Sequence, residues 1–274
     1  MSEQRNRVTV LPAPSGTGTG APGAPPAPPA GVGEWYDHRY ATAANQLATW
    51  EQAAFDAITP GLTPHARVLD LGCGPGYFLT ALVLADPSIR ERAYGFDLSR
   101  VAVEQAARHV PRVSVRDITA PGFAADFPDG FFDAVTLLEV VEHLLDPTVT
   151  VREAVRLLAP DGVLCCSFPN YVNLPWLGLR VAAELLDLPE LINLQPIDRI
   201  YTFPQIKRRL EGFGLRFERA VGATYPPPYF HRLETGWMRR GLDRLGLAAL
   251  SFHPVLIFRK RQGQSQGQGS PALA

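Results

Sequence analysis

Short apolar runs alternate with longer stretches of helical periodicity through the middle of the chain. The pattern predicts a buried strand at 67–71 and further strands at 93–96, 112–116, 132–138 and 162–168. The stretches between them predict helices at 77–85, 99–109 and 146–158. Strands that alternate with helices are typical of a parallel sheet with helices on both faces. Ligands of such sheets bind where the strands end.

The segments around this α/β core are less regular. Apolar and aromatic spacing predicts one helix at 35–58, a helix at 203–213 and two final strands at 215–221 and 252–260. The segment near 170–200 is apolar and partly helical without sheet periodicity, and we interpret it and the segment near 222–250 as insertions that form a substrate lid. Residues 1–33 are rich in Pro, Gly and Ala, and residues 262–274 are rich in Gln and Gly. Both predict disordered tails, which leaves one domain at 34–261.

Composition restricts the class of protein. The 274 residues carry a formal charge of −1, which argues against a general nucleic-acid binder. Residues 198–261 hold 13 Lys and Arg against 5 Asp and Glu, so this quarter is either a solvated basic surface or a patch for an anionic substrate or lipid. Three cysteines give no disulfide framework, and neither an apolar signal core nor a membrane span is present. We expect a cytoplasmic protein without integral membrane segments.

The strongest local motif is a glycine-rich loop between the first predicted strand and its helix. Gly72, Gly74 and Gly76 follow the strand, and glycine permits tight turns and close backbone approach to a ligand. A dinucleotide fingerprint requires glycine at the sixth position, where this chain has Tyr77, and no Walker Lys-Ser/Thr follows. The loop therefore suits a nucleoside whose far end carries an amino acid better than a pyrophosphate.

Two carboxylates lie where such a ligand needs them, and a third lies beside the glycine loop. Asp97 ends the second strand and can accept hydrogen bonds from both ribose hydroxyls. Asp117 follows the third strand and can accept from the exocyclic amine of adenine. Asp70 precedes the glycine loop, and it can orient the loop or meet an ammonium group.

Taken together, the motifs resemble the class I S-adenosylmethionine-dependent methyltransferases over about residues 35–221. The matching segments are 68–76, 95–99, 116–117, 131–139 and 158–163. The resemblance implies a Rossmann-like, mostly parallel seven-stranded sheet whose antiparallel last strand is 252–260. It also implies that the cofactor S-adenosylmethionine is bound by Asp70, Gly72, Cys73, Gly74, Gly76, Asp97, Leu98, Asp117, Ile118 and Glu139.

An acidic motif follows the fourth strand. Glu139, Glu142 and His143 lie at i, i+3 and i+4, a spacing that predicts a helix with all three side chains on one face. This Glu-x-x-Glu-His pattern resembles one in ubiquinone-biosynthesis O-methyltransferases and small-RNA 3′-end methyltransferases. The resemblance implies a site for Mg²⁺. The alternative is that Glu139 packs near the cofactor and the other two side chains stabilise local structure. His143 is also the candidate general base, because an imidazole titrates near neutral pH.

The acceptor is expected to be a small molecule that is methylated on oxygen. Aromatic residues of the two insertions are candidates for its apolar site: Tyr171, Trp176, Tyr201, Tyr225, Tyr229, Phe230 and Trp237. Candidates for an anion contact are Arg199, Arg232, Arg239 and Arg240. Alternatively these side chains form an apolar cap that does not touch the substrate. Peripheral lipid contact through the basic quarter and the oligomeric state both stay open.

Two other functions stay open at this point. Residues 167–170, 176–188 and 201–203 resemble MetW-like proteins, which implies a cofactor-binding partner of another biosynthetic enzyme. An NAD-dependent oxidoreductase is disfavoured by Tyr77 in place of the third glycine.

Overall fold

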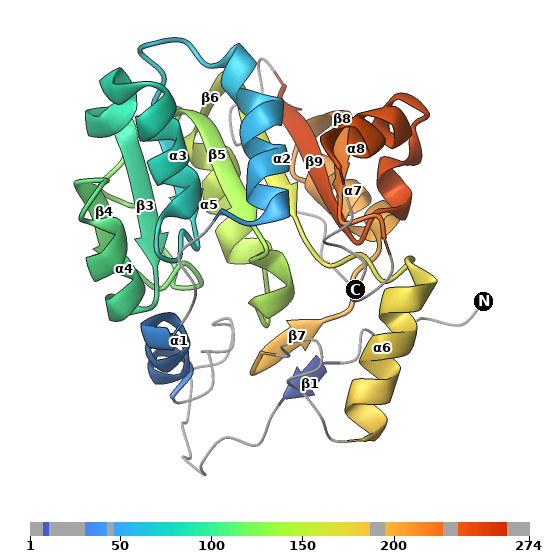
Figure 1. Cartoon of the computed structure of the whole chain (residues 1–274). Helices are drawn as coiled ribbons and strands as arrows, with labels where there is room; N and C mark the ends of the chain where they lie inside the picture. The colour runs from blue at the N-terminus through green and yellow to red at the C-terminus, as the bar shows by residue number, and fades with distance from the viewer. Residues whose placement is uncertain (1–7, 11–30, 43–46, 187–194, 227–234, 262–274) are drawn as a thin grey trace.

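A seven-stranded mixed sheet forms the centre of the protein (Figure 1). The computed structural model describes residues 8–10, 31–42, 47–186, 195–226 and 235–261. The strand order is β4-β3-β2-β5-β6-β9-β8. These strands are β2 (Val68–Leu71), β3 (Ala93–Asp97), β4 (Arg112–Val115), β5 (Phe132–Leu138), β6 (Leu158–Ser167), β8 (Leu215–Ala223) and β9 (His253–Lys260). β9 pairs antiparallel with both β6 and β8, and the other pairs are parallel. The predicted Rossmann-like fold with an antiparallel last strand is confirmed.

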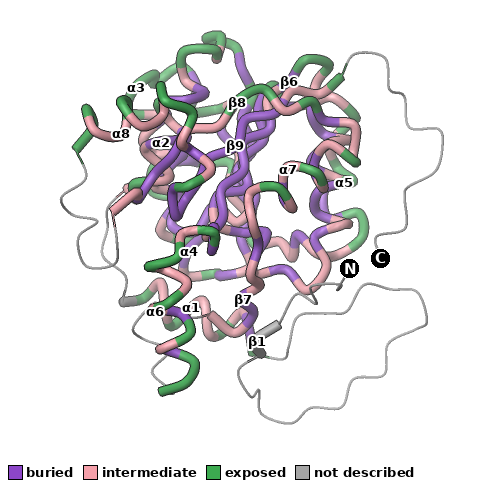
Figure 2. The backbone as a smooth tube through the Cα atoms, turned by 90° about the vertical axis from the view of Figure 1, so that its right-hand side faces the viewer, coloured by how far each residue is buried: buried purple, intermediate pink, exposed green. Residues whose placement is uncertain are grey.

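Helices cover both faces of this sheet, as predicted. The described helices are α1 (Val32–Thr42), α2 (Thr49–Ile58), α3 (Tyr77–Ala85), α4 (Arg100–Ala106), α5 (Thr148–Leu157), α6 (Leu174–Leu185), α7 (Phe203–Gly212) and α8 (Gly236–Arg244). Short 3-10 turns occur at Thr59–Gly61, Pro87–Arg92, Val141–His143 and Leu247–Leu250. Figure 2 shows the buried strands at the centre and exposed residues on the outer helices.

The alternation of side chains along the strands produces two apolar cores. On β9, Leu256 and Phe258 pack with α5 and α7 on one face, while Val255 and Ile257 pack with α2 and α3 on the other. Successive strand residues point to opposite faces, so a strand that is apolar at every position fills both cores. This explains why the strand runs in the sequence are continuous rather than alternating.

Most predicted elements agree with the structure within a few residues, and differences occur at the predicted helix 35–58 and at the start of β6. The predicted helix at 35–58 is two helices, α1 and α2, and residues 43–46 between them lie outside the described ranges. β6 begins at Leu158, four residues earlier than predicted, and takes the last residue of the predicted helix before it. Asp146 Oδ1 accepts a hydrogen bond from the Thr148 amide at 2.9 Å, which satisfies one of the free backbone N–H groups at the start of α5.

A second, two-stranded sheet lies beside the end of the main one. β1 (Val8–Val10) pairs antiparallel with β7 (Ile197–Arg199), and Figure 1 shows both near α6. β1 lies within the segment predicted as a tail at 1–33, and most of that segment is outside the described residues. The predicted tail at 262–274 lies outside them entirely. In the part of the chain that is described, every helix is too short or too polar to cross a membrane.

Candidate active site

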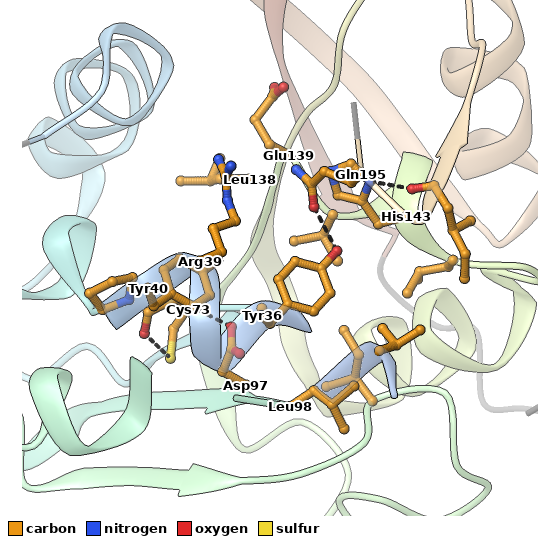
Figure 3. A pocket seen from close by; sticks show the side chains of 18 of the residues that line it. Tyr36, Arg39, Tyr40, Cys73, Asp97, Leu98, Leu138, Glu139, His143 and Gln195 are labelled. Carbon is orange, nitrogen blue, oxygen red and sulfur yellow. Dashed lines mark hydrogen bonds between the residues drawn. The ribbon is translucent and has the colours of Figure 1, made fainter. Parts of the chain in front are cut away.

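A cavity of about 410 Å³ opens where β2, β3 and β5 end. Its walls come from the glycine loop, the turns after β3, β4 and β5, helix α1, the start of α2, and residues just before and within β7. Figure 3 shows α1 crossing this cavity between the end of β3 and the turn after β5. The volume is in the range of small-molecule sites, and the position is that expected for a ligand of a parallel sheet.

The glycine loop is fixed by hydrogen bonds to the end of β3. The amides of Gly72 and Cys73 both donate to the Phe96 carbonyl, at 2.7 and 3.0 Å. Gly74 has a φ of +50°, and a Cβ at this position would lie 3.2 Å from the Tyr40 hydroxyl oxygen. A side chain would be strained there and would press on α1, so glycine is required both by backbone conformation and by close packing.

Asp97 ties the loop to the next turn. Its Oδ2 accepts from the Gly74 amide and its Oδ1 accepts from the Ser99 amide, each at 2.8 Å. The side chain is 7% exposed. Burial raises the pKa of the carboxyl, and it outweighs the hydrogen bonds from these amides, which lower the pKa. Each oxygen has further acceptor capacity, so a carboxylate held in this way can still bind hydroxyl groups of a ligand.

Eight of the ten residues predicted to bind the cofactor line the cavity: Gly72, Cys73, Gly74, Asp97, Leu98, Asp117, Ile118 and Glu139. Asp70 and Gly76 are not in its wall. Gly76 begins α3 with a φ of +76°, and a Cβ there would lie 2.7 Å from the Ala106 Cβ, so it packs against α4. Asp70 is buried within β2, where its Oδ1 lies 2.5 Å from Thr136 Oγ1.

Burial of Asp70 predicts a pH-dependent stability. Burial raises its pKa to about 8, far above that of an exposed aspartate. Between these two pKa values the folded protein keeps a proton that the unfolded chain releases, so the free energy of unfolding should fall as pH rises from 5 to 8. Asp70→Asn should reduce this slope by up to about 1.4 kcal/mol per pH unit. Denaturant unfolding at several pH values measures the slope.

The control for this measurement is Asp86→Asn, because Asp86 lies on the surface in the turn before β3. It should leave the slope unchanged. Glu51 and Glu139, whose pKa values burial raises to about 7 and about 8, act in the same direction and remain in both variants. An Asp70→Asn protein with the wild-type slope would contradict the prediction.

The turn after β4 forms one end of the cavity. Asp117 Oδ1 accepts from the amide of Thr119 at 2.9 Å and from its hydroxyl at 2.6 Å. The carbonyl of Ile118 accepts from the buried Thr150 hydroxyl at 2.8 Å, which holds the turn against α5. The side chain of Ile118 is buried, and this end therefore combines an apolar wall with a carboxylate.

The acidic motif after β5 does not form the predicted helix. Glu139 has a φ of +57°, uncommon for a residue with a side chain, and only Val141–His143 form a 3-10 turn. The prediction that Glu139, Glu142 and His143 share one helical face is therefore wrong. Strain of this kind is often found at functional sites.

Glu139 is held in the cavity wall by groups from two other strands. Its amide donates to Ser167 Oγ at 3.0 Å, and Ser167 Oγ donates to Glu139 Oε1 at 2.8 Å. On the other side, His253 Nε2 lies 3.6 Å from Glu139 Oε2. Burial is the largest cause of the raised pKa of Glu139.

His143 lines the cavity beyond Glu139. Its Nδ1 lies 2.7 Å from the Ile197 carbonyl oxygen, so Nδ1 carries the proton and Nε2 is left as the basic atom. Nε2 lies 3.5 Å from Oε1 of Glu142, which is fully buried. Burial lowers the pKa of His143 to about 4 and keeps the imidazole neutral at neutral pH.

The geometry gives no support to the predicted metal site. In the described ranges, no three His, Cys, Asp or Glu side chains are arranged to hold a metal ion. His143 directs one nitrogen to a backbone carbonyl, and Glu139 is engaged by Ser167. The three residues therefore do not fit Mg²⁺ in this arrangement, and we derive no step through a metal.

Helices α1 and α2 contribute residues that the sequence pattern did not place in the site. Tyr36, Arg39 and Tyr40 line the cavity from α1, and Trp50 and Glu51 line it from α2. The Tyr36 hydroxyl donates to Gln195 Oε1 at 2.6 Å across the cavity (Figure 3). The spacing of Tyr36 and Tyr40 on one helical face is the signal available in the sequence, but the same spacing is typical of any amphipathic stripe.

The aromatic side chains predicted to form the acceptor site take other positions in the described structure. Of the candidates in the described ranges, none lines the cavity. Tyr171 and Tyr201 are buried and accept hydrogen bonds from Arg180 and Arg209, at 3.1 and 3.2 Å. The other described candidates also have structural or surface positions: Trp176 stacks on Phe252, Tyr225 donates to Asp243, and Trp237 is 72% exposed. Tyr229 and Phe230 lie outside the described residues.

The arginines predicted to contact an anion are also absent from the described lining of the cavity. Arg239 pairs with Asp56 at 2.6 Å, Arg199 and Arg240 are not among the lining residues, and Arg232 is outside the described ranges. The insertion near 170–200 does reach the cavity, through Gln195 and Ile197. The insertion near 222–250 contributes none of the described lining residues.

Comparison with known proteins agrees with this architecture. A family profile described as "Methyltransferase domain" matches residues 34–219. A ubiquinone biosynthesis O-methyltransferase of Neisseria meningitidis is 35% identical over 127 residues, which are 44% of this chain and 51% of that protein. The enzyme of the same name from Pseudomonas savastanoi is 32% identical over 171 residues, which are 59% of this chain and 69% of that protein. The chain thus spans about half of the first relative and about two thirds of the second.

Solved structures share the fold at low sequence identity. A putative methyltransferase in complex with the Trm112 activator from Haloferax volcanii has a TM-score of 0.60 and 19% identity, covering 84% of this chain and 98% of that chain. A possible histamine N-methyltransferase from Thermotoga maritima has a TM-score of 0.55 and 16% identity, covering 83% and 93%. The [4+2]-cyclase SpnF has a TM-score of 0.57 and 17% identity, covering 88% and 99%. These likenesses show the fold alone.

Proposed function

The chain belongs to the class I S-adenosylmethionine-dependent methyltransferases, and from this premise we propose that it methylates a hydroxyl group of a small-molecule acceptor. The single observation that supports the proposal is the cavity at the strand ends, where Asp97 holds the glycine loop and His143 presents a neutral imidazole. Oxygen as the acceptor atom is supported by the names of the two curated relatives.

Residues at the end of the cavity near β3 and β4 fit the adenosine part of the donor. We assign the ribose hydroxyls to Asp97 and the exocyclic amine of adenine to Asp117, because a carboxylate accepts hydrogen bonds from both kinds of group. Leu98 and Ile118 supply apolar walls for the ring. Gly72 and Glu139 then lie toward the sulfonium centre.

The acceptor is expected between the turn after β5 and the segment at Gln195. Described lining residues there are mostly apolar, and Tyr36, His143 and Gln195 supply the polar groups. A small organic acceptor with a hydroxyl group matches this chemistry.

Methyl transfer is an in-line displacement in which the donor supplies an activated methyl group. The protein contributes mainly by aligning the reacting atoms, and orientation alone accounts for about 7–11 kcal/mol of barrier lowering in favourable cases. We assign the removal of the hydroxyl proton to His143 Nε2, because the Ile197 carbonyl fixes the proton on Nδ1. Magnesium forms no part of this proposal.

Calorimetry with S-adenosylmethionine and with NADH tests the donor. We expect heat of binding from S-adenosylmethionine and from its demethylated product, and none from NADH. Transfer of a labelled methyl group to a panel of hydroxylated aromatic and lipid-like acceptors then tests the enzyme. Binding without turnover across the panel would favour a cofactor-binding partner protein instead.

Cellular location and lipid contact stay predictions. The three cysteines are buried and unpaired, which supports a reducing compartment such as the cytoplasm. Peripheral contact of the basic C-terminal quarter with lipid has no further support from the geometry.

A further inference from the structure

Arg180 is a fully buried cation in helix α6. Its Nε donates to Glu184 Oε1 at 2.9 Å and its Nη1 donates to the Tyr171 hydroxyl at 3.1 Å. The guanidinium carbon also lies 5.1 Å from the centroid of the Tyr171 ring. Neither partner is among the described residues that line the cavity, so these contacts fix the guanidinium without connecting it to the site.

The same guanidinium also holds strand β7. Its Nη2 donates to the Asp198 carbonyl oxygen at 3.0 Å, and its Nη1 lies 3.2 Å from Asp198 Oδ2. Burial raises the pKa of the Asp198 carboxyl, and the guanidinium of Arg180 lowers it. Because a guanidinium is planar and its N–H groups point in fixed directions, contacts with both the backbone and the side chain of one residue define where that residue lies.

β7 depends on such contacts because it lies outside the main sheet. It has three residues and pairs with β1, which also has three, while the seven-stranded sheet contains neither. A two-stranded pair is only marginally stable by itself. The position of β7 relative to the cavity is therefore set by side chains of neighbouring elements. Figure 1 shows α6, which carries Arg180, beside this pair of strands.

The residue before Asp198 controls the state of the candidate base. The Ile197 carbonyl oxygen lies 2.7 Å from His143 Nδ1. The opposite tautomer of His143 also has an acceptor within reach, because Glu142 Oε1 lies 3.5 Å from Nε2. The hydrogen bond made at one imidazole nitrogen decides which of the two nitrogens carries the proton. A displacement of the Ile197 carbonyl would therefore allow the proton to move to Nε2, and Nε2 could then no longer act as a base.

We propose that Arg180 is a positioning residue for methyl transfer. By holding Asp198, it keeps the Ile197 carbonyl against His143 Nδ1, and Nε2 stays free to accept the proton of the acceptor hydroxyl. This inference rests on the proposed function, in which His143 is the base. It gives the insertion near 170–200 a part in catalysis through a residue that does not line the described cavity.

Kinetics of Arg180→Met give the first test. Methionine keeps most of the apolar length of the side chain and removes the guanidinium. We expect kcat with a hydroxylated acceptor to fall about 10- to 100-fold, because only part of the protein keeps the active tautomer. The Kd for S-adenosylmethionine should change by less than about threefold, since the residues assigned to the donor are untouched.

Nitrogen NMR gives a second test that does not depend on activity. The chain has six histidines, and comparison of ¹⁵N-histidine spectra of the wild type and His143→Gln assigns the signals of His143. At neutral pH the wild type should show a protonated Nδ1 and an unprotonated Nε2. Arg180→Met should shift both signals toward those of a mixture of tautomers.

A double variant separates positioning of the base from general damage to the fold. Adding Arg180→Met to His143→Gln should lower the residual kcat by less than about threefold, because the base is already absent. If the two losses in kcat instead multiply and the His143 signals of Arg180→Met match those of the wild type, Arg180 is only structural and the inference is overturned.

Three further variants complete the set. Arg180→Lys keeps the charge and should recover part of kcat. Glu184→Gln removes the charge of a partner of the same guanidinium outside β7, and should retain wild-type kcat and nitrogen signals. Arg180→Met with Asp198→Asn leaves no unpaired carboxylate at residue 198, so it serves if Arg180→Met alone does not fold. It should show the same loss of kcat and the same shifts.

Failure of the inference and failure of the proposed function are distinguishable. A folded Arg180→Met protein with kcat within threefold of the wild type and with unchanged His143 signals would overturn the inference while leaving the proposed function in place. A wild-type protein that methylates no acceptor would contradict the proposed function. The nitrogen signals would still show in that case whether Arg180 fixes the tautomer of His143.

Discussion

Asp97→Ala should weaken binding of S-adenosylmethionine by at least about 100-fold, which corresponds to about 3 kcal/mol. The variant removes the acceptor that we assign to the ribose hydroxyls. It also leaves the amides of Gly74 and Ser99 without their present acceptor, so the glycine loop loses its attachment to the turn after β3. Both effects act on the free energy of donor binding. Calorimetric titration of the purified variant measures the change.

Two comparisons show whether this loss is specific. Asp97→Asn keeps one acceptor oxygen and should bind the donor with intermediate affinity. Asp126→Ala removes an exposed carboxylate that pairs with Arg116 away from the cavity, and should leave the affinity unchanged. The free energy of unfolding of each variant is measured alongside, because burial of the Asp97 carboxyl already costs stability. Donor affinity within threefold of the wild type in a folded Asp97→Ala protein would show that the ribose assignment is wrong.

The sequence was sufficient for elements whose signal is local. Three glycines between an apolar strand and a helix identified the loop from Gly72 to Gly76, and the structure places the loop between β2 and α3. Asp97 and Asp117 were predictable for a similar reason, since Asp97 ends β3, Asp117 comes shortly after β4, and parallel strands end at one edge of a sheet. Strand periodicity and the positions of glycine therefore located most of the residues in the part of the cavity that we assign to the donor.

Local periodicity failed where one backbone angle decides the structure. Glu139 to His143 has helical spacing, but Glu139 adopts a left-handed φ and its side chain bonds to Ser167 on the neighbouring strand. That conformation depends on a contact between residues 28 positions apart, which no sequence window contains. The predicted helical face was lost with it.

The part of the cavity that we assign to the acceptor depends on contacts that are still longer in range. Tyr36 and Gln195 meet across 159 positions, and α1 is held beside the cavity by long-range bonds such as that of Asp37 to the turn after β3. The insertions are rich in aromatic residues, as an acceptor site would require. However, the hydroxyl groups of Tyr171 and Tyr201 accept hydrogen bonds from arginines instead of facing the cavity. Composition identifies what a segment can bury, whereas tertiary packing decides which side chains face a ligand.

His143→Gln should lower kcat by about 10²- to 10⁴-fold while the Kd for S-adenosylmethionine changes by less than about threefold. Glutamine can still donate to the Ile197 carbonyl, so the turn after β5 should keep its shape, but it cannot accept the proton of the acceptor hydroxyl. The assay uses a hydroxylated acceptor at a pH below the pKa of its own hydroxyl group, because an acceptor that is already ionised needs no base. The exposed His109→Gln is the matched control and should retain wild-type kcat.

The pH profile distinguishes a base from a structural histidine. Burial lowers the pKa of His143 to about 4, so the imidazole is neutral and able to accept a proton at every pH well above that value. As pH falls through about 4, protonation removes the base, and the wild-type kcat at saturating donor should fall with it. The residual activity of His143→Gln should lack this acidic limb, because the titrating group is gone. If the variant instead keeps kcat within threefold of the wild type with the same profile, then the proton leaves by another route and Nε2 of His143 is not the base.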